Sequence, residues 1–169
     1  MKVRGGCGRR APGDRPGGPF LPDLLARASH ALVQGFAEEL RERGTSLPVW
    51  RVLAALSARP NETVTGLAEA CLLQQPTMTK LLDRMARDGL VARSQDARDR
   101  RVVHVALTPE GEARAAELAV AAARYEAEVL ARHPQAAGIR AVLRDIVARS
   151  GPALRHTRDG EDGQGGEGA

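Results

Sequence analysis

The hydrophobic period of the chain changes between residues 76 and 107, and this change limits the possible folds more than any other feature. Residues 76–88 carry apolar side chains at the spacing i, i+3, i+4 and i+7, which predicts a helix with one buried face. These side chains are Met78, Leu81, Leu82 and Met85. Residues 90–93 and 102–107 are short, mostly apolar segments on either side of the polar loop 94–101. Two such segments around a charged loop predict a β-hairpin.

Helical periodicity covers most of the remaining chain. The predicted helices span residues 23–43, 48–59, 65–71, 76–88, 109–132 and 135–149. Gly44 and Gly89 are placed to end two of these helices, Thr108 to cap the fifth, and Pro134 to break the chain between the last two. The expected fold class is therefore mainly α with a small β-hairpin. A helix–turn–helix followed directly by such a hairpin is the winged-helix arrangement, here flanked by helices at both ends.

The two ends of the chain differ in composition from the middle. Twelve of the 18 glycines lie in residues 1–19 and 151–169, which cannot bury enough apolar surface to offset the entropy of ordering. We expect a disordered basic arm over residues 1–19 and a disordered tail over 150–169. The arm either adds non-specific attraction to phosphates or is only a solvated tail.

Composition excludes several classes of protein. The beginning of the chain lacks the apolar stretch of a secretory signal, and no apolar run approaches the ~18 residues of a membrane span, so we expect a cytoplasmic protein. Aromatic residues make up only 2%, too few for binding single-stranded nucleic acid by stacking. The sequence pI of about 9.8 is compatible with a nucleic-acid partner without proving one.

The polar face of helix 76–88 is suited to a DNA groove. Opposite its apolar stripe the helix carries short, polar and then basic residues. The residues on this face are Pro76, Thr79, Lys80, Asp83 and Arg87. Small side chains let a helix enter the major groove, where hydroxyl and ammonium groups reach base edges or phosphates. An ordinary surface helix of mixed charge is the alternative for this segment alone.

The predicted hairpin loop concentrates arginine. It holds Arg98, Arg100 and Arg101, and a narrow groove of negative potential attracts arginine carried by a thin loop. Asp96 lies two residues before Arg98, so we expect its carboxylate to hold the Arg98 guanidinium. A solvated turn with internally paired charges is the alternative.

Several of these segments together resemble the MarR family of bacterial transcription regulators. The matching residues are Leu67-Ala68-Glu69, Gly89-Leu90-Val91, Arg93, Asp96-Ala97-Arg98-Asp99-Arg100-Arg101 and Leu107-Thr108-Pro109-Glu110-Gly111. The resemblance covers most of residues 47–111. Two features depart from it: Pro76 stands where the family often has serine, and the turn Leu72-Leu73 lacks the glycine of simpler helix–turn–helix motifs.

The resemblance implies a homodimer on double-stranded DNA. Residues 20–46 and 109–149 would dimerise, and residues 47–108 would form the DNA-binding lobe. Helix 76–88 would enter the major groove and Arg98 the minor groove, with Asp96 orienting that arginine. The DNA-binding residues implied or selected in this way are Gln75, Thr77, Thr79, Lys80, Arg84, Asp96, Arg98, Arg100 and Arg101.

Many members of this family release DNA when a small aromatic or anionic effector binds. In such a layout His30, Gln34 and Trp50 would lie near the effector pocket, although a core or interface position is the expected one for Trp50. Some members sense oxidants through a cysteine on the first helix, which has none here. We expect Cys71 to be a small buried hydrophobe, and Cys7 has no ordered partner in view.

Three classes of function compete for this sequence. The first is a ligand-responsive repressor or activator that binds a pseudo-palindromic operator. The second is an architectural DNA-binding protein without an effector. The third, an enzyme, has no support, because the sequence contains no glycine-rich phosphate loop, nucleophile elbow or metal-ligand spacing. We therefore expect no catalytic residue, no metal and no cofactor.

Overall fold

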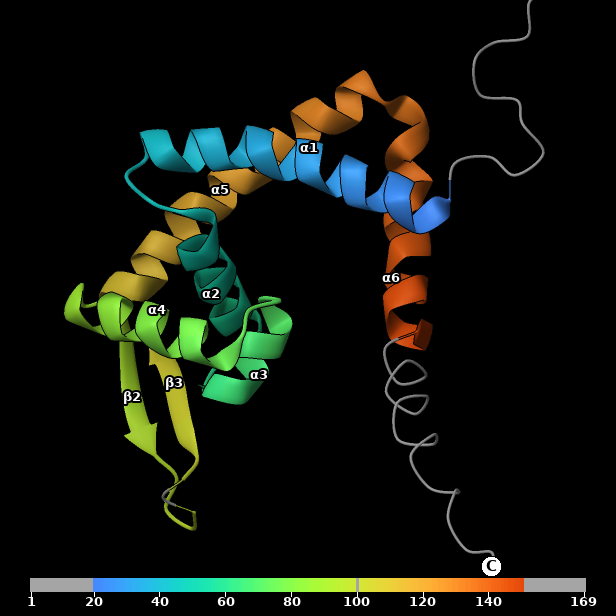
Figure 1. The fold of residues 1–169 in the computed structure, drawn as a ribbon. Helices are drawn as coiled ribbons and strands as arrows, with labels where there is room; N and C mark the ends of the chain where they lie inside the picture. Colours follow the sequence, from blue (N-terminus) through green and yellow to red (C-terminus); the bar gives the residue numbers. More distant parts are fainter. Residues whose placement is uncertain (1–19, 100, 151–169) are drawn as a thin grey trace, which may run out of the picture. The chain divides into compact units, whose positions relative to one another are not determined.

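The computed structural model describes residues 20–99 and 101–150, which are mostly helical with a small sheet (Figure 1). The chain forms two compact units, one ending at Ala122 and the other beginning at Ala123. The predicted arm and most of the predicted tail lie outside the described residues, as does Cys7. No helix in the described ranges is both long and apolar enough to cross a membrane. The predicted fold class is confirmed.

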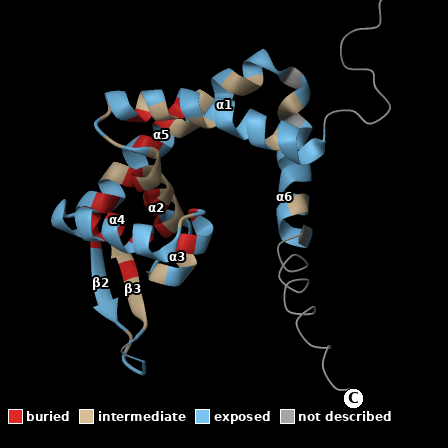
Figure 2. Cartoon of the chain, in the orientation of Figure 1, coloured by how far each residue is buried: buried red, intermediate tan, exposed pale blue. Residues whose placement is uncertain are grey.

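Two helices, α2 (Leu47–Ala58) and α4 (Gln75–Arg87), supply eight of the 18 buried apolar residues in the described part of the chain. Each buries one apolar stripe at helical spacing, and the stripe predicted for α4 is confirmed (Figure 2). The buried residues are Val49, Val52, Leu53 and Leu56 on α2, and Met78, Leu81, Leu82 and Met85 on α4. Burial of one such side chain contributes about 1.5–3 kcal/mol, so these stripes hold the unit together.

Helix α1 (Leu21–Glu42) packs on α2 through its C-terminal half. Its buried residues are Phe36 and Leu40, and the ring of Phe36 meets Trp50 of α2 edge-on, with centroids 5.9 Å apart. The helix ends where predicted, since Gly44 takes the left-handed conformation with φ +69°. Trp50 is thus half-buried and packs against α1.

A three-stranded antiparallel sheet has β3 (Val103–Leu107) in its centre. Strand β2 (Val91–Gln95) pairs with β3 as the predicted hairpin, with Ser94 opposite His104. The third strand, β1 (Glu62–Thr63), pairs on the other side of β3, with Thr63 opposite His104. Sequence periodicity did not predict β1, because two residues are too few to show an alternation.

The short helix α3 (Val64–Ala70) completes the helix–turn–helix with α4. Thr63 caps α3, since its hydroxyl accepts a hydrogen bond from the Gly66 amide at 3.0 Å. The same device begins helix α5 (Pro109–Arg132), where the Thr108 hydroxyl accepts from the Gly111 amide at 3.0 Å. The capping role predicted for Thr108 is therefore confirmed.

The second unit, described over residues 123–150, contains the end of α5 and two further elements. Residues Pro134–Gly138 form a 3₁₀-helix, η1, and Ile139–Ser150 form α6. The prediction of one α-helix over 135–149 was wrong for its first turn. The tighter turn begins at Pro134, and within it the Ala136 amide donates to the His133 carbonyl at 2.8 Å, the shorter span of a 3₁₀-helix. An ion pair between Arg140 and Glu126 links α6 to α5.

Candidate nucleic-acid interface

The polar face of α4 is exposed, as the helical spacing predicted. Thr77, Thr79, Lys80 and Arg84 are all exposed, and Figure 2 shows the outer surface of α4 as mostly exposed. Lys80 and Arg84 have no acidic partner among the described residues. Their positive charges are therefore available to an anionic partner.

Two of the predicted contact residues on α4 already make hydrogen bonds within the protein. The Gln75 side-chain amide donates to the Thr65 hydroxyl of α3 at 2.9 Å. The Thr79 hydroxyl donates to the Gln75 carbonyl at 3.0 Å, so only its oxygen lone pairs remain to accept a bond. Gln75 thus fixes α4 against α3, a role that its position in the sequence did not reveal.

The turn between α3 and α4 contains a strained residue. Leu72 adopts φ +56° although it is not glycine, and 84% of its surface is exposed. The turn is closed by backbone bonds from Cys71 to Leu67 and from Leu73 to Ala68, both at 2.9 Å. These bonds hold Leu72 in a conformation that a leucine adopts only at a cost of about 1–2 kcal/mol. The missing glycine noted in the sequence therefore has a structural consequence.

Replacing Leu72 by glycine should stabilise the protein. Glycine takes the left-handed conformation without strain, and little packing is lost at so exposed a position. After subtraction of the larger entropy of glycine in the unfolded chain, we expect a gain of about 0.5–1 kcal/mol in the free energy of unfolding by urea titration. The matched control, Leu72→Ala, keeps the strain and should not gain. Equal stability of the two variants would contradict the strain at Leu72.

Arg93 connects the base of the hairpin to α4. Its guanidinium donates to the Asp83 carboxylate at 2.7 Å and to the Thr79 carbonyl at 3.1 Å. These bonds fix β2 relative to the exposed face of α4 and neutralise the one acidic group predicted on that face. Sequence reasoning did not assign this role to Arg93, because the partners lie 10 and 14 residues away.

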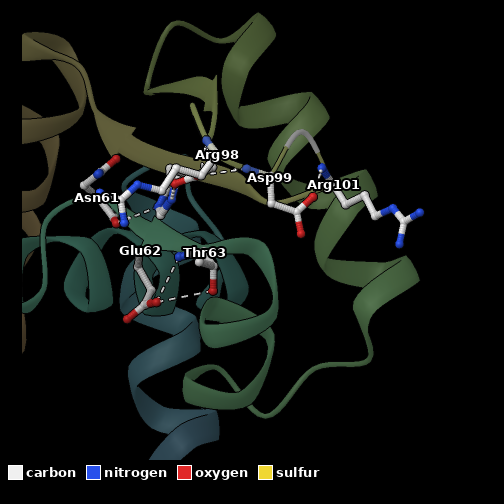
Figure 3. A network of polar contacts seen from close by, with 8 residues as sticks. Asn61, Glu62, Thr63, Arg98, Asp99 and Arg101 are labelled. Carbon is white, nitrogen blue, oxygen red and sulfur yellow. Dashed lines mark hydrogen bonds and ion pairs between the residues drawn. The ribbon is translucent and has the colours of Figure 1, made fainter.

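The hairpin loop is shaped by carboxylates that accept bonds from its own backbone. One oxygen of Asp96 accepts from the amides of Arg98 at 2.8 Å and Asp99 at 3.0 Å. The Asp99 carboxylate accepts from the Arg101 amide at 2.9 Å (Figure 3). The expected bond from Asp96 to the Arg98 guanidinium was wrong, because the tight turn brings the Arg98 amide, not its side chain, to the carboxylate.

The loop therefore presents arginine side chains outward while its acidic groups are occupied. Arg98 and Arg101 are exposed and have no ion-pair partner in the described part of the chain. Arg100 lies outside the described residues. The amides of Arg98 and then Asp99, followed by the His104 ring, lower the pKa of Asp96, so this carboxyl stays ionised at neutral pH.

His104 is held between two other segments of the first unit. Its two ring nitrogens lie 3.3 Å from the Asn61 carbonyl oxygen and 3.2 Å from Asp96 Oδ2. The residue does point away from the buried face of β3, where Val105 is fully buried. That outer side is covered because the segment before β1 and the hairpin loop both fold over it. Figure 3 shows Asn61 and the loop residues of this network.

The other residues considered for sensing are dispersed. His30 and Gln34 are exposed on α1, while Cys71 is only 1% exposed at the end of α3. Burial raises the pKa of the Cys71 thiol, which disfavours the reactive thiolate. The prediction that Cys71 acts as a small buried hydrophobe is confirmed.

Comparison with known proteins points to one family. The model of the MarR family matches residues 45–103. The chain is similar to the homoprotocatechuate degradative operon repressor of Escherichia coli, with 32% identity over 93 residues, which are 55% of this chain and 63% of that protein. The chain thus spans less than two thirds of the length of this relative.

Solved structures extend the similarity to about three quarters of the chain. A MarR family transcriptional regulator from Silicibacter pomeroyi is 37% identical, with a TM-score of 0.69 over 76% of this chain and 93% of that one. The regulator BpsR of Bordetella bronchiseptica, whose DNA binding is regulated by 6-hydroxynicotinic acid, is 26% identical, with a TM-score of 0.66 over 75% of this chain and 97% of that one.

Proposed function

Because this chain belongs to the MarR family of transcription regulators, we propose that it binds a pseudo-palindromic operator as a homodimer and acts as a ligand-responsive repressor. One observation carries the proposal. The exposed face of α4 and the arginine loop are joined by the bonds of Arg93 to Asp83 and Thr79, so both present free cations from one rigid support. Such a helix and loop match the major groove and the adjacent minor groove of one duplex.

The geometry suggests a division of roles among the predicted contact residues. Thr77 and Lys80, near the start of α4, are the candidates for base edges and phosphates of the major groove. Arg98 is the candidate for the minor groove, with Arg84 and Arg101 as phosphate contacts. Gln75 and Asp96 support the interface through their internal bonds.

Exposed apolar residues support the homodimer. Apart from Leu72, every exposed large apolar residue in the described ranges lies in residues 20–46 or 109–149. Val142 and Val147 of α6, for example, are 57% and 74% exposed. Apolar surface of this extent favours association, and these are the segments that we assign to dimerisation. A second copy of the chain is the partner that we propose to cover it.

Repression relieved by a small aromatic acid is the finer part of the proposal. The Escherichia coli relative is a repressor of a degradative operon, and DNA binding by BpsR responds to 6-hydroxynicotinic acid. An effector acts by binding more tightly to a dimer whose two α4 helices no longer match the groove spacing. An architectural DNA-binding protein would lack both this response and sequence preference.

Selection from a random duplex library tests the proposal. The purified full-length protein is mixed with the library at ~150 mM salt, and the bound sequences are determined. We expect an inverted repeat with half-sites about one helical turn, roughly 34–36 Å, apart. Binding without enrichment would favour the architectural protein. Absence of binding by protein freed of small molecules by denaturation and refolding would contradict the DNA-binding function itself.

The replacement Arg98→Ala should weaken binding to the selected operator without unfolding the protein. Loss of one arginine contact of this kind costs about 1–3 kcal/mol, or roughly five- to 150-fold in Kd. Fluorescence anisotropy at fixed salt measures the change. Arg41→Ala is the matched control, because it removes the same charge from another exposed position. Arg41 lies on α1 and pairs with Glu38. Equal affinities of the two variants would rule out the role of the loop.

A further inference from the structure

The two ring nitrogens of His104 both face hydrogen-bond acceptors. Nδ1 lies 3.3 Å from the backbone carbonyl oxygen of Asn61, and Nε2 lies 3.2 Å from Oδ2 of Asp96. A carbonyl oxygen only accepts, and an ionised carboxylate only accepts. A neutral imidazole carries one N–H, so it can satisfy one of these partners. Only the imidazolium, with an N–H on each nitrogen, donates to both.

The carboxylate that His104 contacts is the one that shapes the DNA-facing loop. Oδ1 of Asp96 accepts from the amides of Arg98 and Asp99, while Oδ2 lies against the ring. His104 is on the central strand β3, between β1 and β2. Its ring therefore ties the arginine loop on one side to the segment that enters the helix–turn–helix on the other.

We propose that His104 is a positioning residue of the DNA-facing loop, and that its imidazolium form, by bridging Asn61 and Asp96, makes operator affinity depend on pH. The inference rests on the proposed DNA-binding function. Affinity is highest when the ring is protonated, because the loop is then held from both sides. It falls as the pH rises and one of the two bonds is lost.

The other charged groups around β3 are engaged elsewhere. Glu62 of β1 accepts from the Thr63 amide at 2.8 Å and lies 3.7 Å from Arg59. On β2, the residue opposite His104 is the uncharged Ser94, and Arg93 is bound to Asp83. Asp96 is thus the acidic group in direct contact with the ring.

The helices packed on β3 and the loop itself complete the set of neighbours. Helix α2 carries one charged residue, Arg51, which donates to the Cys71 carbonyl at 3.5 Å, and α3 carries one, the exposed Glu69. In the described part of the loop, the Arg98 and Arg101 side chains are exposed and Asp99 accepts from the Arg101 amide. Protonation of His104 therefore acts chiefly through Asp96.

The test measures operator affinity between pH 6 and pH 8 for the full-length wild type and for His104→Gln. We expect the wild type to bind about three- to fivefold more tightly at the lower pH than at the higher. The glutamine variant should bind like the wild type at pH 8 and lose this difference. Because the other three histidines, His30, His133 and His156, are present in both proteins, the comparison isolates His104. Identical pH profiles would overturn the proposal.

A further variant separates positioning from a simple gain of charge. Asp96→Asn keeps the titrating ring but removes its anionic partner. If protonation acted only by adding a positive charge near the DNA, this variant would retain the full pH profile, and that result would also overturn the proposal. A profile flattened as in His104→Gln supports it.

NMR of the free protein tests the link between His104 and the loop without DNA. In the free wild-type protein, the backbone amide NMR signals of Arg98 and Asp99 should shift together with the titration of the His104 ring, and these shifts should vanish in His104→Gln. Their absence in the wild type would overturn the positioning role whatever the DNA experiments show. If the shifts occur but no duplex is bound at any pH, the proposed function fails and the link between His104 and the loop stands.

Discussion

The replacement Met78→Asp is expected to unfold the first unit. Met78 is fully buried on the inner face of α4, and the residues around it in the core are apolar. A carboxylate there either loses its hydration without a partner or remains protonated as an unsatisfied polar group. We expect a loss of more than about 4 kcal/mol in the free energy of unfolding, enough to unfold many domains of this size. Thermal and urea unfolding followed by circular dichroism measure it.

The control for Met78→Asp is the same replacement at the preceding residue, Thr77→Asp. Thr77 is exposed in the first turn of α4, where an acidic side chain is favourable to the helix dipole. Thr77→Asp should therefore stay within about 0.5 kcal/mol of the wild type. A soluble Met78→Asp protein with the wild-type melting temperature would refute the assignment of this face of α4 to the core.

The replacement Gly111→Ala is expected to be the second most damaging change, although it adds only a methyl group. A Cβ at Gly111 would lie 2.0 Å from the carbonyl oxygen of Leu90 and 3.0 Å from its carbonyl carbon. Both atoms belong to the backbone, and the same oxygen accepts from the Thr108 amide at 3.2 Å. The start of α5 must therefore move away from the segment that leads into β2. Overpacking of this kind costs about 1–3 kcal/mol, and we expect the upper end of that range.

Gly138→Ala provides the comparison for Gly111→Ala. A Cβ at Gly138 would have no atom within 4 Å. The free energy of unfolding of this variant should therefore differ from that of the wild type by no more than about 0.5 kcal/mol. Urea titration of both proteins measures the difference. Because β2 begins one residue after Leu90, we also expect Gly111→Ala to bind the selected operator more weakly than Gly138→Ala. Equal stability of the two alanine variants would show that α5 does not approach Leu90 so closely.

Local spacing was sufficient to predict the helices and much of the exposed surface that we propose to face DNA. The apolar stripe from Met78 to Met85 defined both the buried side of α4 and, by exclusion, its exposed side. A short polar segment between two apolar ones likewise predicted the hairpin and its arginine loop. These features depend on residues within about two helical turns of one another, so their period is visible in the sequence.

Only the tertiary structure decided which side chains hold this surface in place. Arg93 bonds to α4, His104 reaches both Asn61 and Asp96, and Gly111 lies against Leu90. The two-residue strand β1 was equally invisible. In each of these cases the cause is a contact between segments that are distant along the chain. Leu72 differs, because its left-handed conformation is set by the bonds of its own turn, where the sequence showed only that a glycine is missing. Periodicity predicts which face of a helix or strand is buried, but it does not predict which residues from other segments contact the element.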